Sequence, residues 1–362
     1  MNIFLEKIKG YVSWLNTRVS FGVFIFSGIV IASFAWYVSF GLQGVHTPVA
    51  AALSQATLQH VTSSTNNSLS LLTEPDDGVL QVKQAIEQAT TSIDLVIYEL
   101  QDPEMLQALA DAKLRGVKVR VMLQNLSTFG RHPNQAAYDF LQSHGVSVHW
   151  APAYFSLTHQ KTLVVDHIVA FIMTLNLVPK YYNSSRDFII IDADPVDVKE
   201  ITLVFNADWN GASIDAAAAN DLVWSPGSEK MLVALIQSAV NSIDVYNEEM
   251  ADPVITKALE DAAKRGVLVR VDMTYATQWK QALNDLVIHG VQVKTYSSSA
   301  RFYIHAKMVM VDSKLAFVGS ENFSEPSLQS NRELGILVTK TDLLTGLEET
   351  FKKDWAGSRT YQ

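Results

Sequence analysis

The chain has 362 residues, enough for one large or two medium domains with a substantial hydrophobic core. Its formal net charge of −9 and sequence pI near 5.5 argue against a general nucleic-acid binder, which normally carries a basic face. The chain contains no cysteine, which excludes disulfides, thiolate metal sites and a cysteine nucleophile and suits an extracytoplasmic bacterial enzyme without establishing one.

The first element is an apolar segment at residues 19–42, which lies in a stretch without charged side chains between Arg18 and Glu74. The segment is long enough to cross a bilayer. Residues 1–18 contain three basic side chains, so the positive-inside rule predicts a cytoplasmic amino end and an extracytoplasmic catalytic body. We expect an uncleaved transmembrane anchor because the apolar run is longer than that of an ordinary signal peptide. Small residues at 49–52 leave cleavage and secretion as the alternative.

After a predicted flexible stalk at residues 43–73, rich in small and polar residues, the chain repeats itself. The segment SIDLVIYELQDPEMLQALADAKLRGVKVRV is echoed, 150 residues later, by SIDVYNEEMADPVITKALEDAAKRGVLVRV. Each copy predicts a strand, a helix that begins at Asp-Pro and ends at Arg-Gly, and a second strand. This alternation predicts two α/β halves, residues 74–220 and 221–362, each with a mixed or mostly parallel sheet covered by helices.

Further helices flank this unit in each half. They are predicted at residues 79–89 and 134–143 in the first half and at residues 229–240 and 277–288 in the second. The later helix of each pair ends at His144 or His289 before a glycine. We interpret these histidines as polar residues at a helix end rather than as site residues.

Each half then carries the same polar residues in an apolar setting. In the second half, FYIHAKMVMVDSKLAFVGSEN predicts two short strands joined at Asp312, with His305 and Lys307 on one face. An imidazole beside a fixed cation suits a phosphate group whose oxygens need neutralising and whose leaving group needs a proton. The matching residues, each shifted by 146, are His159 and His305, Lys161 and Lys307, Asp166 and Asp312, Thr174 and Ser320, and Asn176 and Asn322.

This double H-x-K-x4-D pattern resembles the double HKD motif of the phospholipase D superfamily. The resemblance covers roughly residues 77–355 and is specific for the superfamily but not for the substrate. It implies an α/β fold of two homologous halves that meet about a pseudo-two-fold axis. Because both motifs are in one chain, we expect the protein to be active as a monomer. One departure is Met173-Thr174, where the second half has Gly319-Ser320, and this departure predicts a slightly different loop.

Two carboxylates, Asp187 and Glu333, each open an apolar strand after the motif and are again 146 residues apart. An imidazole that attacks phosphorus needs its other nitrogen held by a carboxylate. The resemblance implies a crosswise arrangement, in which Glu333 orients His159 and Asp187 orients His305. We interpret the arginine before each carboxylate as a partner in a structural ion pair.

The resemblance also implies the roles of the motif residues. One histidine attacks phosphorus and forms a phosphohistidine, while the other protonates the leaving alcohol and then activates water or an acceptor alcohol. Attack is assigned to His159 by resemblance only, because the internal symmetry leaves the two histidines interchangeable. Lys161, Lys307, Asn176 and Asn322 are expected to hold the phosphoryl oxygens, with Asp166, Asp312, Thr174 and Ser320 in supporting positions.

Zinc binding is the rival use of two histidines, but the lysines would place positive charge where the cation must lie. We therefore expect neither metal nor cofactor.

Three reactions remain open. Hydrolysis of phospholipid head groups is our first prediction, because of the expected anchor, the acidic body and the apolar segment 154–157 before the first motif. Phosphatidyl transfer to an alcohol, as in cardiolipin-synthase-like members, is the alternative. A phospholipase D-family endonuclease is the third, disfavoured by net charge, so nucleic acid is not an expected partner. A non-catalytic binding protein is disfavoured by two intact motifs.

Overall fold

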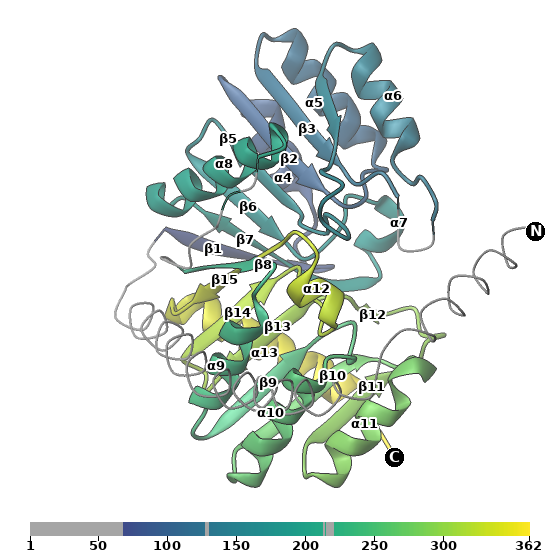
Figure 1. Cartoon of the computed structure of the whole chain (residues 1–362), viewed down its shortest axis with the longest axis vertical. Helices are drawn as coiled ribbons and strands as arrows, with labels where there is room; N and C mark the ends of the chain where they lie inside the picture. Colours follow the sequence, from purple (N-terminus) through teal and green to yellow (C-terminus); the bar gives the residue numbers. More distant parts are fainter. Residues whose placement is uncertain (1–67, 127–129, 213, 215–220) are drawn as a thin grey trace, which may run out of the picture. The chain divides into compact units, whose positions relative to one another are not determined.

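Figure 1 shows the computed structural model of the chain, which describes residues 68–126, 130–212, 214 and 221–362. The predicted membrane span at residues 19–42 and most of the predicted stalk lie outside these ranges. Within the described ranges, no helix is both long enough and apolar enough to cross a membrane.

Each half contains one mixed sheet, and the two sheets have equivalent strand orders. The first sheet has the order β1-β7-β6-β5-β2-β3-β4, and the second has the order β8-β15-β14-β13-β9-β10-β11-β16. The first sheet comprises β1 (Leu69–Glu74), β2 (Ser92–Ile97), β3 (Lys118–Leu123), β4 (Ser147–Trp150), β5 (Thr162–Val165), β6 (Val169–Met173) and β7 (Ser185–Asp192). The second comprises β8 (Leu222–Ser225), β9 (Ser242–Tyr246), β10 (Leu268–Thr274), β11 (Gln292–Tyr296), β13 (Lys307–Val311), β14 (Leu315–Gly319), β15 (Glu333–Val338) and β16 (Arg359–Thr360).

Helices cover the outer faces of both sheets, as the alternating sequence pattern predicts. The outer helices are α4 (Leu80–Gln88), α5 (Pro103–Leu114) and α6 (Gln135–Ser143) in the first half, and α9 (Glu229–Ser238), α10 (Pro253–Lys264) and α11 (Lys280–Ile288) in the second. The Asp-Pro signals mark the starts of α5 and α10, because Asp102 accepts hydrogen bonds from the backbone of Glu104 and Met105, and Asp252 does the same in α10. Predicted and observed bounds agree to within two residues except at α11, where the predicted start at residue 277 is the start of a short 3₁₀ helix, η1 (Thr277–Trp279), that precedes it.

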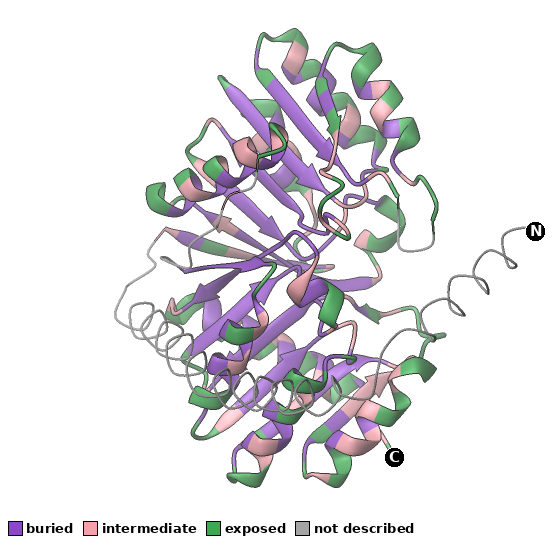
Figure 2. Cartoon of the chain, viewed as in Figure 1, coloured by how far each residue is buried: buried purple, intermediate pink, exposed green. Residues whose placement is uncertain are grey.

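The inner faces of the two sheets share one core. This central cluster combines residues of the first half, such as Phe188, with residues of the second half, such as Met308 and Val318. Helices α8 (Pro195–Trp209) and α13 (Thr341–Gly357) add apolar side chains to it. Buried strands run through both sheets in Figure 2, and the two α/β halves therefore form one body with a shared interface.

Two strands depart from the predicted organisation. Residues 69–73, expected at the end of the stalk, form most of β1, whose six residues pair with β7. In addition, β12 (Tyr303–Ile304) of the second half pairs with β7 of the first. Both strands depend on partners far away in the sequence, and the apolar periodicity of such short segments does not reveal those partners.

Candidate active site

Backbone hydrogen bonds between the halves place each motif histidine. The amides of His305 and Ala306 both donate to the carbonyl of Arg186, at the point where β12 runs along β7. The amides of His159 and Gln160 donate in the same way to the carbonyl of Arg332. Since a carboxylate follows each of these arginines, the crossing backbone brings each histidine to the carboxylate of the other half.

The side chains complete the crosswise arrangement. His159 Nδ1 lies 3.0 Å from Glu333 Oε2, and His305 Nδ1 lies 2.7 Å from Asp187 Oδ1. These are the two pairs that the sequence resemblance implied. With Nδ1–H donated to a carboxylate, Nε2 of each ring is the atom left to react.

Hydroxyl groups of the motifs hold the carboxylates in turn. Thr174 Oγ1 donates to Asp187 at 2.6 Å, and Ser320 Oγ donates to Glu333 at 2.7 Å. The backbone amides of Thr174 and Ser320 also bond at equivalent places, so the loop difference predicted from Met173 and Gly319 is not seen in the backbone pairing. The difference lies in side-chain packing instead.

Both motif lysines are buried beside their histidines. Lys161 is 1 % exposed and Lys307 is fully buried, and each Nζ donates to the carbonyl oxygen of the histidine two residues earlier. Burial lowers the pKa of Lys161 to about 7, although Glu333 opposes this shift. Burial also lowers the pKa of His159, and the charge of Lys161 adds to this effect while Glu333 opposes it. At neutral pH, His159 is therefore an uncharged imidazole.

Both histidines open onto one cavity of about 1140 Å³ between the halves. Its lining includes His159, His305, Asp187 and the motif asparagines Asn176 and Asn322. Asn176 Oδ1 accepts a bond from the Glu99 amide, whereas the buried Asn322 Oδ1 has no protein partner. The cavity thus holds two reactive ring nitrogens and amide groups that a phosphate could contact.

The described fold matches known proteins over most of its length. Residues 82–209 and 232–355 match the family described as "Cardiolipin synthase, PLD-like domain". The chain belongs to the phospholipase D superfamily. Among curated relatives, the cardiolipin synthase of Halalkalibacterium halodurans is 23 % identical over 81 % of this chain and 67 % of its own length. Cardiolipin synthase A of Proteus mirabilis is 22 % identical over 77 % of this chain and 67 % of its own length.

Solved structures show the same fold. Phosphatidylserine synthase from Haemophilus influenzae superposes with a TM-score of 0.65 at 12 % identity, covering 85 % of this chain and 92 % of that one. Polyphosphate kinase from Porphyromonas gingivalis superposes with a TM-score of 0.63 at 14 % identity, covering 82 % of this chain and 49 % of that one.

The motif aspartates of this phospholipase D-like chain have structural partners. Asp166 accepts hydrogen bonds from the backbone amides of residues 90–92, and Asp312 from those of residues 240–242. Both lie in turns with positive φ, 56° and 52°. Burial alone would raise their pKa values, but the backbone donors hold the pKa of each below its usual range. The aspartates therefore tie each hairpin turn to the loop before β2 or β9.

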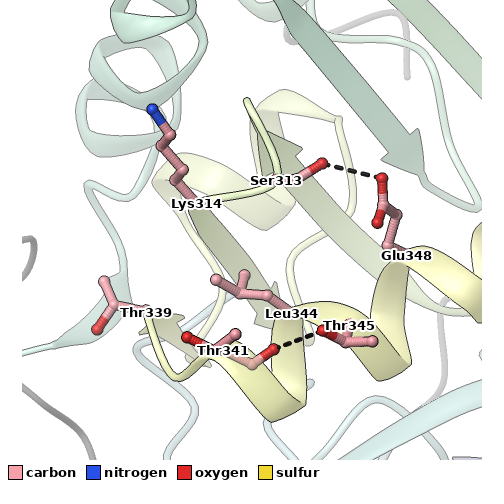
Figure 3. Close-up of a pocket in the computed structure, with 7 residues that line it drawn as sticks. All are labelled: Ser313, Lys314, Thr339, Thr341, Leu344, Thr345 and Glu348. Carbon is pink, nitrogen blue, oxygen red and sulfur yellow. Dashed lines mark hydrogen bonds between the residues drawn. The ribbon is translucent and has the colours of Figure 1, made fainter.

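A smaller cavity of about 190 Å³ lies beside the second of these turns, and Figure 3 shows its residues. Ser313, next to Asp312, donates to Glu348 of α13 at 3.0 Å, and Lys314 and Leu344 line the same hollow. Neither motif histidine is among its lining residues. This smaller cavity therefore lies at the turn between β13 and β14, apart from the cavity onto which the motif histidines open.

The arginines before the carboxylates form buried ion pairs, as interpreted from the sequence. Arg186 binds Asp354 at 2.6 and 3.0 Å, and Arg332 binds Asp208 at 2.8 and 3.0 Å. The second pair explains the apolar segment 154–157. The Phe155 ring packs on the Arg332 guanidinium at 4.3 Å, and the Tyr154 hydroxyl donates to Asp208.

Of that segment, only Leu157 lines the cavity. Tyr154 and Phe155 instead lie around the Arg332–Asp208 pair, so their place on an apolar approach to the site stays a prediction.

Sequence reasoning missed Glu248, which reaches the second motif directly. Its Oε2 lies 3.1 Å from Lys307 Nζ and 3.5 Å from His305 Nε2, and its Oε1 accepts a bond from the Tyr303 hydroxyl at 2.9 Å. Burial alone would raise the pKa of Glu248, but Lys307 and His305 hold it well below its usual range. A signal was present, because the 150-residue repeat aligns Glu248 with Tyr98, a large chemical difference beside matched motifs.

Proposed function

We propose that this chain transfers the phosphatidyl group of a phospholipid to an alcohol through a phosphohistidine intermediate. The two crossed histidine–carboxylate pairs carry this proposal, because a two-step transfer needs one nucleophile and one acid–base group at a single phosphorus. The curated relatives named above are cardiolipin synthases, which favours transfer over hydrolysis. They reverse the order of our first two predictions, since transfer was the alternative and hydrolysis the first choice.

In the first step, Nε2 of His159 attacks phosphorus and forms a P–N bond while the bond from phosphorus to the head-group oxygen breaks. His305 gives its proton to the departing oxygen. His159 suits attack because it is uncharged, and its Nδ1–H is held by Glu333, which stabilises the positive charge that develops on the ring.

In the second step, His305 removes the proton from the hydroxyl of an acceptor alcohol. The acceptor oxygen attacks phosphorus, the P–N bond breaks and His159 returns to its starting form. Water in place of the alcohol would give hydrolysis from the same intermediate. Lys161 and Lys307, with Asn176 and Asn322, stabilise the phosphoryl oxygens in both transition states.

The test uses the full-length protein in mixed micelles with phosphatidylglycerol, with and without added alcohol, and with DNA in parallel. We expect a new phosphatidyl alcohol whose yield rises with alcohol concentration. Phosphatidic acid as the sole product at high alcohol concentration would show a hydrolase. Cleavage of DNA with lipid untouched would show a nuclease, which the net charge of −9 disfavours.

A further inference from the structure

Glu248 lies where the alcohol part of a substrate must sit. In the proposed reaction, His305 Nε2 contacts the oxygen of both the leaving and the accepting alcohol. The carboxylate of Glu248 lies 3.5 Å from that nitrogen, so it reaches a substituent on the carbon next to the alcohol carbon. The Tyr303 hydroxyl holds Oε1 at 2.9 Å and leaves Oε2 directed at His305 and Lys307.

The first half-site has no carboxylate in this position. Its equivalent residue, Tyr98, lies edge-on to the His159 ring, with ring centroids 4.7 Å apart. A second difference between the half-sites also places an additional acidic residue near His305. Glu74 pairs in register with Asp187, whereas the equivalent Ser225 pairs with Glu333. The His305 side of the cavity therefore carries two acidic residues that the His159 side lacks.

The buried part of the cavity wall offers acceptors, whereas its basic side chains, Arg131, Lys180 and Arg301, are exposed. Among the described residues, the buried side-chain atoms that line the cavity and have no protein partner are all oxygens: both carboxylate oxygens of Glu74, Asn322 Oδ1 and Asn331 Oδ1. Asn331 donates its amide nitrogen to Glu333, which fixes that oxygen as an acceptor. A buried acceptor without a donor costs free energy, so this wall favours a ligand with several N–H or O–H groups.

The negative charge of Glu248 favours an amine over a hydroxyl as the group on the neighbouring carbon of the bound alcohol. Lys307 and His305 now face Glu248, but a bound phosphate would share the charge of the lysine, and His305 gives its proton to the leaving group in the first step. A partly buried carboxylate then needs another cation, which a neutral hydroxyl cannot supply. An ammonium group on the neighbouring carbon restores the balance and also donates up to three hydrogen bonds.

We propose that Glu248 selects an alcohol with an ammonium group on the carbon next to the alcohol carbon, a 2-amino alcohol, as leaving group or acceptor. This assignment rests on the proposed phosphoryl transfer. It makes Glu248 a specificity-determining residue on the His305 side of the cavity.

Three alcohols of nearly equal size test the assignment: 2-aminoethanol, ethylene glycol and propan-1-ol. They differ only in a terminal ammonium, hydroxyl or methyl group. With phosphatidylglycerol as donor, at a pH that keeps the amine protonated, we expect full-length protein to prefer 2-aminoethanol over propan-1-ol in kcat/KM by about tenfold or more. Glu248→Gln should remove most of this preference, whereas propan-1-ol transfer reports any general damage to the site.

Two further variants control the test. Glu99→Gln removes a carboxylate that lines the same cavity beside Tyr98, and it should leave the preference unchanged. Tyr303→Phe keeps Glu248 but removes the hydroxyl that holds it, so it should give an intermediate preference even if Glu248→Gln folds poorly.

Other outcomes would overturn the assignment. An equal fall with all three alcohols in Glu248→Gln would show that Glu248 only positions Lys307 and His305. Better transfer to ethylene glycol than to 2-aminoethanol would show a polyol site. If no alcohol accepts, the proposed transfer fails, but hydrolysis of phosphatidylethanolamine against phosphatidylpropanol still reads the same subsite from the leaving group. Equal rates there would refute the role of Glu248 independently.

Discussion

The two half-sites share their motif residues but differ in their surroundings. His159 lies against the aromatic ring of Tyr98, whereas His305 faces the carboxylate of Glu248. The two motif lysines also differ in their neighbours. Lys307 is paired with Glu248, whereas Lys161 Nζ lies 5.5 Å from the Tyr98 ring centroid. Repetition of a motif therefore sets where the reacting groups lie, and the residues around the motif set what each group does.

A similar difference lies behind the motifs. Gly319 pairs with Gly335 in the second half, where the first half pairs Met173 with Ile189. A Cβ atom on Gly319 would lie 2.3 Å from Glu321 Oε2 and 2.5 Å from Gly335 Cα. In the second half, the buried Glu321 carboxylate and the Phe317 ring thus lie where side chains at 319 and 335 would be, whereas the first half carries larger aliphatic side chains at 173 and 189.

Loss of either motif histidine should have the largest effect. We expect His159→Asn and His305→Asn each to lower turnover by about a thousandfold or more, because each removes a separate chemical role. Circular dichroism should show an unchanged fold. Trapping the phosphorylated enzyme distinguishes the roles of the two histidines. His305→Asn should still become labelled slowly at His159, whereas His159→Asn should not become labelled. Label at His305 in the latter variant would reverse the roles.

The crossed carboxylates should come next. Glu333→Gln and Asp187→Asn should each lower kcat by about a hundredfold or more, because each leaves its histidine without a charge partner as the imidazolium forms. Glu333 also accepts bonds from Ser320, Ser327 and Asn331, so its replacement should lower the melting temperature further than that of Asp187. Equal melting temperatures for the two variants would show that the two carboxylates contribute similarly to the stability of the fold.

Much of this arrangement could be predicted from the sequence. The repeat, the Asp-Pro helix starts and the matched spacings predicted two α/β halves and the set of motif residues, because each signal is local or repeats at a fixed shift. The crosswise pairing of His159 with Glu333 came from the family resemblance. No local signal carries it, since it depends on backbone hydrogen bonds between residues 173 positions apart, from His159 to Arg332.

What the sequence could not predict depends on tertiary contacts between segments far apart in the chain. Tyr154 and Phe155 look like an apolar approach, yet they pack around the Arg332–Asp208 ion pair. Glu248 follows β9, and the pairing of β9 with β13 brings the segment with Tyr303 and His305 to it. The 150-residue repeat marks Glu248 as different from Tyr98, but no sequence spacing identifies the partners of Tyr154, Phe155 or Glu248.

The packing difference behind the motifs predicts a loss of stability. Gly319→Ala should cost about 3 kcal/mol of the free energy of unfolding, because its Cβ meets the backbone of Gly335 as well as Glu321. Rebuilding the first-half set with Gly319→Met, Glu321→Leu and Gly335→Ile together should recover part of this loss. Urea unfolding of the single and triple variants measures both. A triple variant less stable than Gly319→Ala would show that the halves are not interchangeable here.

The acidic His305 side predicts a pH dependence of stability. Burial raises the pKa of Glu74 from 4.5 to about 7, and Asp187 adds to this shift. Below pH 4.5 the group is protonated in both folded and unfolded chains. Between pH 4.5 and 7 the unfolded chain loses this proton first, so stability falls as pH rises, by no more than about 3 kcal/mol.

Glu74→Gln should remove this part of the loss. The difference in free energy of unfolding between variant and wild type should therefore grow in favour of the variant from pH 4.5 to pH 8. Ser225→Ala, at the equivalent position of the other half, is the control and should add no pH dependence. An identical pH profile for Glu74→Gln and wild type would contradict the raised pKa.

Removal of metal ions should have the smallest effect in both half-sites. Each motif histidine has a buried lysine two residues away and a carboxylate on Nδ1, so in the proposed reaction Lys307 and protonated Lys161 would supply positive charge for the phosphate. A divalent ion would have to approach these cations, which is unfavourable. We expect turnover to stay within about twofold after thorough chelation, because the transition-state charge is met by these fixed groups. Activity lost to a chelator and restored by one specific ion would instead make the histidines metal ligands, and His305, already faced by Asp187 and Glu248, would be the first to examine.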